Sequence, residues 1–348
     1  MNPIVRIKYY AQKVARQIWQ KNDGEYVERI ASELEAFDEN ENVHDLPEIF
    51  HYWSNKYLRP KLEMFGLTDP EQFFFTYSLR QCEGSNRSIR IVSIGAGNCD
   101  MEAQMAQRLV EAGQRKFKID CIDINDSMLQ RGVEHAQNMG VGQYVQPQKG
   151  DFNRWQPTNH YDVVIANQSL HHVVELESLF SAIKRCLTPT GVFLTSDMIG
   201  RNGHQRWPEA LTAMQPFWEE LPGSYRYNRL LKRQEDTYIN HDCSTSGFEG
   251  IRAQDILPLL VKNFYFELFV PFANIVGVFL DRPFGHNYDA SGEWDRGFID
   301  RVHACDEAGI LSGAWKPTQM LSVLRTSPIE TQLTDPRLTP EFCIRPPN

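Results

Sequence analysis

The chain has 348 residues, which is enough for about two domains of ordinary size. It carries 36 basic and 45 acidic residues, giving a formal net charge of −9, and 41% of its residues are hydrophobic. This composition excludes a disordered chain, a collagen and a small disulfide-stabilised protein. The acidic balance also argues against a dedicated nucleic-acid-binding protein, which usually presents a basic face.

The cysteines and the apolar segments point to a reducing, aqueous compartment. Seven cysteines are scattered along the chain, and none are close enough to form a zinc knuckle or a CxxC redox pair. Residues 1–20 lack the continuous apolar stretch of a signal peptide. The most apolar window, 264–280, is interrupted by Glu267, Pro271 and Asn274 and is too short to cross a bilayer. We therefore expect a cytoplasmic protein without a membrane span.

The first part of the chain, residues 1–85, is expected to form a helical segment that acts as a cap or an oligomerisation surface. Apolar residues recur at helical spacing over 4–18 and again over 26–37. The acidic stretch 35–45 is typical of a solvated connection. A further helix, rich in aromatic residues, is predicted over 46–65.

From residue 86 onward, short apolar runs alternate with helical patterns. Strands are predicted at 89–94, 118–123, 144–151, 161–167 and 191–199. Such alternation is typical of βαβ units and predicts an α/β fold with a parallel sheet. We assign residues 86–285 to this core, with 200–250 as a lid inserted after the fifth strand. Two β-rich runs within 264–280 predict a terminal hairpin, and 286–348 are expected to form a helix and a loosely ordered tail.

Glycines and a carboxylate follow the first two predicted strands. Gly95, Ala96 and Gly97 come directly after the first strand, where glycine permits a tight turn and close approach of the backbone to a ligand. Asp123 ends the second strand, and a carboxylate there can accept hydrogen bonds from both hydroxyls of a ribose. A simple strand–helix turn and a helix N-cap are the alternative roles of these residues.

The next two strands also end in polar residues. Asp151 and Phe152 end the third strand, where a carboxylate can accept an adenine amino proton and an aromatic ring can cover the base. Asn167 and Gln168 end the fourth strand. Because ligands of open α/β sheets bind at the carboxyl ends of the strands, we expect all four strand ends to converge on one ligand.

Five segments together resemble a class I S-adenosylmethionine-dependent methyltransferase: IVSIGAGNCD, IDCIDIND, QKGDF, YDVVIANQSLHHV and LTPTGVFLTSD. The resemblance is to the small-molecule branch that includes the ubiquinone/menaquinone-biosynthesis methyltransferases. It implies a Rossmann-like, seven-stranded sheet whose last strand is antiparallel, and S-adenosyl-L-methionine as the cofactor. By position, it implies cofactor contacts from Gly95, Ala96, Gly97, Asp123, Ile124, Asp151, Phe152, Asn167 and Gln168.

Two positions depart from the pattern of that family. Ser93 stands where an acidic residue often precedes the glycine loop, and Cys99 stands where a third glycine is common. We therefore expect a rearranged contact with the amino-acid end of the cofactor.

Histidines and aromatic residues are the candidates for the acceptor side. A histidine can act as a general base when the acceptor is a hydroxyl, and the catalytic candidates are His171, His172 and His241. The lid residues His204, Trp207, Tyr225, Tyr227 and Tyr238 are the candidates for binding the substrate. The alternatives are a structural role for the histidines and packing of the lid aromatics on the core. No metal ligands are assigned.

The predicted function is methyl transfer from S-adenosyl-L-methionine to a small molecule, at oxygen, with no nucleic-acid partner. A nicotinamide-dependent oxidoreductase is the first alternative, but Asp100 occupies the position of the last glycine of its fingerprint. A nucleic-acid amino-methyltransferase would carry Asn or Asp, two prolines and an aromatic residue after the fourth strand, and this chain has Asn167, Gln168, Ser169 and Leu170 there. A non-catalytic binding module on the same fold is the remaining alternative. A homodimer through the N-terminal helices is also expected.

Overall fold

The computed structural model describes residues 24–35, 46–83, 85–245 and 247–346. Their centre is an eight-stranded sheet with the order β10-β8-β9-β5-β4-β1-β2-β3. The strands are β1 (Ile89–Ile94), β2 (Phe117–Asp123), β3 (Val145–Lys149), β4 (Tyr161–Asn167), β5 (Leu187–Met198), β8 (Tyr265–Phe272), β9 (Gln319–Arg325) and β10 (Gln332–Leu333). All neighbours pair in parallel except those of β9, which runs antiparallel to both β5 and β8. The prediction of a mostly parallel α/β sheet with one antiparallel strand is confirmed.

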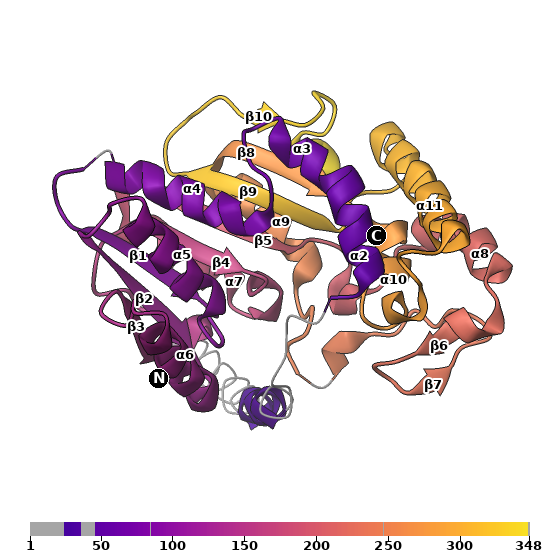
Figure 1. Cartoon of the computed structure of the whole chain (residues 1–348), viewed down its shortest axis with the longest axis horizontal. Helices are drawn as coiled ribbons and strands as arrows, with labels where there is room; N and C mark the ends of the chain where they lie inside the picture. The colour runs from indigo at the N-terminus through magenta and orange to yellow at the C-terminus, as the bar shows by residue number, and fades with distance from the viewer. Residues whose placement is uncertain (1–23, 36–45, 84, 246, 347–348) are drawn as a thin grey trace, which may run out of the picture.

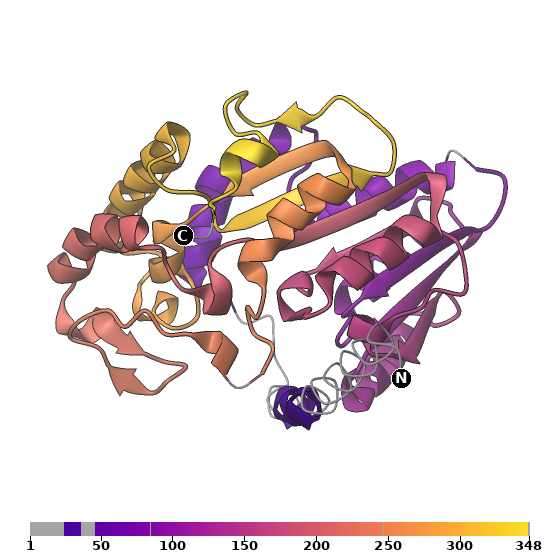
Figure 2. The same ribbon diagram turned by 180° about the vertical axis from the view of Figure 1, so that it is seen from behind.

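Helices cover both faces of the sheet (Figures 1 and 2). One face carries α4 (Pro70–Glu83), α5 (Asp100–Glu111) and α6 (Asp126–Asn138), and the other carries α7 (Leu176–Cys186) and α9 (Ala253–Asn263). The central strand β1 is apolar on both sides, because Ile91 packs into the first of these layers and Val92 into the second. This double burial explains why β1 is a continuous apolar run in the sequence.

A second group of helices packs beside the β8–β9 end of the sheet (Figure 1). It contains α2 (Glu48–Trp53), the π-helical turn η1 (Ser54–Leu58), α3 (Arg59–Glu63), α8 (Pro208–Glu220), α10 (Ile275–Leu280) and α11 (Glu293–Ser312). Helix α10 contacts α2, α8 and α11, so segments far apart in the sequence form one layer here. The N-terminal helix predicted over 26–37 is present over 24–35, whereas the patterns at 4–18 and 36–45 lie outside the described residues.

The predicted hairpin at 264–280 is wrong. Its first half is β8, but its second half is helix α10. The carboxylate of Asp306, on α11, accepts hydrogen bonds from the backbone amides of Asn274, Ile275 and Val276 at 2.7–3.2 Å. These amides would otherwise be unpaired at the start of a helix, so a residue about thirty positions away caps α10.

The antiparallel strand comes instead from the segment that was expected to hold only a helix and a tail. Strand β9 inserts between β5 and β8, and the short β10 adds an eighth strand at the edge. The predicted number of seven strands is therefore wrong, and the sheet continues beyond residue 285. Among the described residues, no helix is long and apolar enough to cross a membrane.

Candidate active site

The glycine loop after β1 lies against the end of β4. Gly95 and Gly97 have φ values of 70° and 53°, a region that residues with a side chain rarely adopt. A Cβ atom on Gly95 would come within 2.6 Å of the Cβ of Ser169. The hydroxyl of Ser169 in turn donates to the carbonyl of Ile94 at 2.7 Å. The loop therefore requires glycine at position 95, and it leaves no room between the two strand ends for a side chain.

Asp123 ties the glycine loop to the end of β2. One carboxylate oxygen accepts from the amide of Gly97 at 2.8 Å, and the other accepts from the amide of Asn125 at 2.9 Å. Burial raises the pKa of Asp123, and these backbone hydrogen bonds oppose that effect. Each oxygen keeps a second lone pair that can accept from a ribose hydroxyl. Ile124 follows in the bend between β2 and α6, half-buried.

The third strand end carries a contact that the sequence does not predict. Asp151 caps the 3-10 turn η2 (Phe152–Arg154) and accepts from the amide of Asn153. Both of its oxygens also accept the hydroxyl of Tyr26, at 2.8 Å each. Tyr26 lies on helix 24–35, so this helix reaches the carboxylate predicted to bind adenine. Phe152 is 8% exposed and packs in the core beneath the turn.

Ser93 has a buried acidic partner. Its hydroxyl donates to Glu102, on α5, at 2.5 Å, and both side chains are almost fully buried. Burial raises the pKa of Glu102 to about 7, although the hydrogen bond from Ser93 lowers it. The carboxyl group of Glu102 therefore lies beside Ser93, the position at which the resembled family often carries an acidic residue.

The end of β4 is strained and leads directly to the histidines. Asn167 ends the strand, and Gln168 has a φ of 52°, which is uncommon for a residue with a side chain. The amide of Gln168 donates to the carbonyl of Ser196 on β5 at 2.8 Å. After this bend the chain forms the 3-10 turn η3 (Leu170–His172). Strained backbone of this kind is often found at functional sites.

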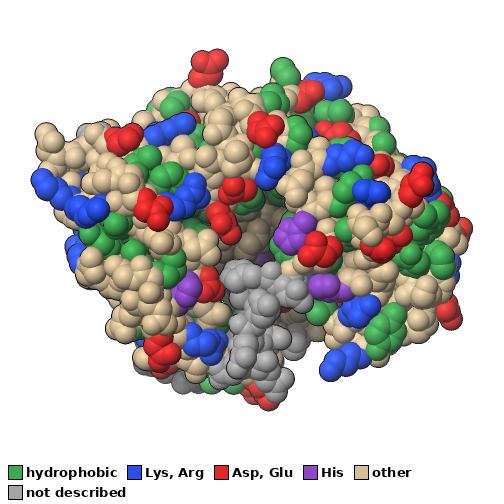
Figure 3. All heavy atoms as spheres, in the orientation of Figure 1, with side chains coloured by type: hydrophobic (Ala, Val, Ile, Leu, Met, Phe, Trp, Pro, Cys, Tyr) green, Lys and Arg blue, Asp and Glu red, His purple; other side chains and the backbone are tan. Residues whose placement is uncertain are grey.

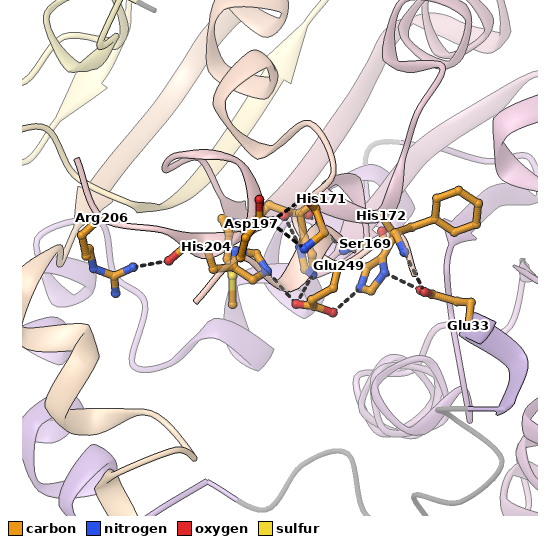
Figure 4. Close-up of polar contacts among 12 residues, drawn as sticks. Glu33, Ser169, His171, His172, Asp197, His204, Arg206 and Glu249 are labelled. Atoms are coloured by element: carbon orange, nitrogen blue, oxygen red, sulfur yellow. Dashed lines mark hydrogen bonds and ion pairs between the residues drawn. The ribbon is translucent and has the colours of Figure 1, made fainter. Parts of the chain in front are cut away.

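Three histidines and three carboxylates meet beside this turn, and we call them the histidine–carboxylate cluster: Glu33, His171, His172, Asp197, His204 and Glu249 (Figure 4). Glu249 stands at the centre. Its carboxylate oxygens lie 2.6 Å from Nε2 of His204, 3.6 Å from Nε2 of His171 and 3.4 Å from Nε2 of His172. Figure 3 shows a hollow in the face of the molecule with acidic and histidine side chains around it.

Asp197 positions His171. The carboxylate is fully buried near the end of β5 and accepts from the amides of Ser169 and Leu170, at 3.0 and 2.7 Å. Its other oxygen lies 2.7 Å from Nδ1 of His171. Because a carboxylate can only accept, Nδ1 of His171 donates to Asp197, and its Nε2 faces Glu249.

The charges in the cluster differ from one imidazole to the next. Burial lowers the pKa of His172, but the ion pair with Glu33 and the charge of Glu249 raise it to about 9. Burial lowers the pKa of His204, and the hydrogen bond with Glu249 opposes this effect. Although burial raises the pKa of Glu249, His204 and the neighbouring imidazoles hold it well below its usual range. At neutral pH the cluster therefore contains a charged His172 and an ionised Glu249.

A family described as a methyltransferase domain matches residues 85–245. The ubiquinone/menaquinone biosynthesis C-methyltransferases UbiE of Salmonella arizonae and Salmonella newport are 29% identical over 150 residues. That stretch is 42% of this chain and 56% of the relatives, so the chain spans about half the length of the curated relatives that it matches. Residues 85–245 form a class I S-adenosylmethionine-dependent methyltransferase domain.

Two solved structures match the chain at low similarity. A putative sarcosine dimethylglycine methyltransferase from Galdieria sulphuraria is 15% identical, with a TM-score of 0.42 over 73% of this chain and 84% of that chain. An O-methyltransferase from a Brevibacillus brevis polyketide synthase is 14% identical, with a TM-score of 0.44 over 87% of this chain and 84% of that chain.

The cofactor of the methyltransferase domain is S-adenosyl-L-methionine, and the strand ends fit it. The positive-φ glycine loop, Asp123 and Asp151 all lie at the carboxyl edge of the sheet, and Asp123 keeps acceptor capacity for a ribose. The last glycine of a dinucleotide fingerprint is absent at Asp100. The family match and this residue together favour methyl transfer over the oxidoreductase alternative.

The remaining candidate residues do not join the cluster. His241 is exposed, and the described residues give its ring no hydrogen bond to the histidines. Trp207 packs between the guanidinium groups of Arg201 and Arg345, at 5.2 and 4.1 Å. Tyr227 is 39% exposed on the short hairpin of β6 (Tyr227–Asn228) and β7 (Arg233–Gln234).

Tyr225 and Tyr238 make their ring contacts with the helical layer. Tyr225 packs against Tyr288 and Trp294, and Tyr238 packs against Trp218. Of the five predicted substrate residues, the structure therefore brings only His204 to the cluster. Glu33, Asp197 and Glu249 were not predicted. Only Asp197 left a sequence signal, as a lone carboxylate after the apolar residues of β5.

Proposed function

We propose that the protein transfers the methyl group of S-adenosyl-L-methionine to an oxygen atom of a small molecule. The histidine–carboxylate cluster is the observation that carries this proposal. The cluster adjoins the glycine loop, because Ser169 contacts Gly95 and begins the turn that holds His171 and His172. It therefore lies next to the edge of the sheet where we expect the cofactor to bind.

A neutral hydroxyl is a weak nucleophile, so methylation at oxygen needs a group that accepts the proton. The cofactor supplies a methyl group that is already activated by a positive sulfur, and the protein has to align the acceptor and remove its proton. The pair of Asp197 and His171 fits this task, because Asp197 holds Nδ1 and turns Nε2 of His171 toward the centre of the cluster. The charged Glu249 stabilises positive charge that develops there.

His172 and His241, the other predicted bases, are less suited to this role. His172 already carries a proton at neutral pH and is paired with Glu33 at 2.5 Å. His241 is exposed and apart from the cluster. We therefore propose that removal of the hydroxyl proton depends on His171, and not on His172 or His241.

The proposal also concerns the segments outside the methyltransferase domain. Helix 24–35 contributes Glu33 to the cluster, and Arg29 on the same helix donates to the carbonyls of Ser244 and Gly247 at 2.9 and 2.7 Å. The helix and the insertion 200–250 thus contact each other at the cluster, which supports a role of both in enclosing the acceptor. A homodimer through the N-terminal helices and a cytoplasmic location remain predictions.

The acceptor atom can be tested with S-adenosyl-L-methionine that carries a deuterated methyl group. The protein is incubated with fractions of a small-molecule extract, and products that gain the labelled methyl are identified by mass spectrometry and NMR. We expect the label in a methyl ether or ester and expect H171A to abolish its formation. A label on carbon or nitrogen would refute the choice of oxygen. No labelled product from any fraction, with cofactor binding intact, would favour the non-catalytic alternative.

A further inference from the structure

Three side chains of the cluster present donor atoms at metal-ligand spacing. The ligating atoms of His171, His204 and Glu249 all lie within 4.8 Å of one another. In a tetrahedral shell with bonds of about 2.1 Å, neighbouring donor atoms are about 3.4 Å apart. Glu249 lies 3.6 Å from Nε2 of His171, close to that value. Its 2.6 Å hydrogen bond to His204 has to open by less than about 1 Å to admit an ion.

The second nitrogens of two imidazoles are held by carboxylates from elsewhere in the fold. Nδ1 of His171 is 2.7 Å from Asp197, and Nδ1 of His172 is 2.5 Å from Glu33. Histidines that bind metals almost always pass their other ring N–H to a carboxylate or carbonyl, which fixes the ring and raises the basicity of the ligating nitrogen. The contact of Asp197 with Nδ1 of His171, which turns Nε2 toward Glu249, is the second observation that points to a metal ligand.

The surroundings provide both rigidity and access. His171 and His172 are 3% and 8% exposed, whereas the side chain of Glu249 is 40% exposed. The two buried rings come from the short turn η3, which Asp197 holds through two backbone amides. An ion at this point would therefore have fixed nitrogen ligands on one side and an open approach on the side of Glu249.

We propose that the histidine–carboxylate cluster is a binding site for one divalent transition-metal ion. The ligands are Nε2 of His171, Nε2 of His204 and the carboxylate of Glu249. A set rich in imidazole favours Zn²⁺ and its neighbours in the first transition row over Mg²⁺, which takes oxygen ligands.

The role of the ion rests on the proposed function, but its binding does not. With an ion bound, Nε2 of His171 would be a ligand and no longer the base, and the ion would take over the activation of the acceptor. An open position on the ion would bind the acceptor oxygen and lower the pKa of the hydroxyl, as it does for bound water. The hydroxyl proton passes to solvent, the oxygen forms a bond to the methyl carbon, and the sulfur keeps the electron pair of the broken S–C bond. The metal does not change its oxidation state in this reaction.

The site can be tested by metal binding alone. The full-length protein is stripped with a chelator and titrated with Zn²⁺, Co²⁺ and Mg²⁺ by calorimetry, and the visible absorption of bound Co²⁺ reports its ligands. We expect one equivalent of Zn²⁺ or Co²⁺ per chain and no saturable binding of Mg²⁺. E249Q and H204A should each weaken binding at least tenfold, and D197N should weaken it by about 10- to 100-fold. H160A removes an exposed histidine before β4 and should leave binding unchanged.

Two outcomes would overturn the metal site. One is the absence of stoichiometric binding in the stripped wild-type protein. The other is binding that E249Q and H204A do not weaken although thermal unfolding shows both variants to be folded. Metal-independent methyl transfer in the stripped protein would refute the role of the ion while leaving the proposed function intact. Metal binding without any methyl transfer would refute the proposed function alone.

Discussion

The contacts of Asp123 predict how much the Kd for the cofactor should rise in the variant D123N. Its two oxygens each accept one backbone amide, so D123N replaces one acceptor with an NH₂ group that faces an N–H donor. The ribose then also loses a hydrogen bond to a charged acceptor, which contributes about 1.5–3 kcal/mol. At about 1.4 kcal/mol for each factor of ten, the Kd should rise by about 10- to 150-fold.

Calorimetry with S-adenosylhomocysteine measures this change without knowledge of the acceptor. The matched control is D126N, which removes the same charge three residues later from a side chain that is 65% exposed and paired with Lys149. We expect D126N to bind like the wild type. An unchanged Kd for D123N, or equal losses in both variants, would refute the placement of the ribose at Asp123.

Two further changes test the interior of the same region. G95A should lower the free energy of unfolding by at least about 2 kcal/mol, because the left-handed backbone costs about 1–2 kcal/mol and the new Cβ lies 2.6 Å from Ser169. Gly113 also has a positive φ, but the space around its Cβ position is open. G113A should therefore lower the free energy of unfolding, measured by chemical denaturation, only by the cost of the left-handed backbone. E102Q should stabilise the protein at pH 8 by about 1–3 kcal/mol, because the pKa of Glu102 is raised by burial to about 7. The matched control E111Q, at the exposed last residue of α5, should leave the free energy of unfolding unchanged.

The sign of the Glu102 effect follows from its titration. Since its pKa in the folded state is raised above the unfolded value, the folded state binds more protons between about pH 4.5 and pH 7. The stability from this group is complete below that window and is lost as the pH rises through it. The difference between E102Q and the wild type should therefore shrink toward pH 5. Equal losses in G95A and G113A, or a pH-independent effect of E102Q, would contradict these assignments.

The order of strands along the methyltransferase domain could be predicted because each signal is local. An apolar run buried on both faces, such as Ile89–Ile94, differs from the helical pattern that follows it. Likewise, Asn125 caps α6 through the amide of Met128, three residues away, and Gly113 ends α5 with the positive φ that glycine tolerates. These features need only a few neighbouring residues, so the sequence predicts them directly.

Features that depend on distant partners could not be predicted in this way. The sequence of α10 is equally compatible with a strand, and the carboxylate of Asp306 decides for a helix by pairing with its first amides. Strand β9 follows a twenty-residue helix and still inserts between β5 and β8. Its antiparallel pairing depends on two strands that precede it in the chain by about 50 and 120 residues.

The candidate site also contains both kinds of feature, some predictable from neighbouring residues and others dependent on distant partners. The glycine loop, Asp123 and the two adjacent histidines could be predicted from the residues alone, because parallel strands place their carboxyl ends, and the residues that follow them, at one edge of the sheet. The groups that surround those histidines depend on the three-dimensional fold. Glu33, Asp197 and Glu249 come from a helix, a strand end and a loop spread over more than 200 residues. A buried imidazole requires a polar partner, but chain folding alone determines which distant carboxylate supplies it.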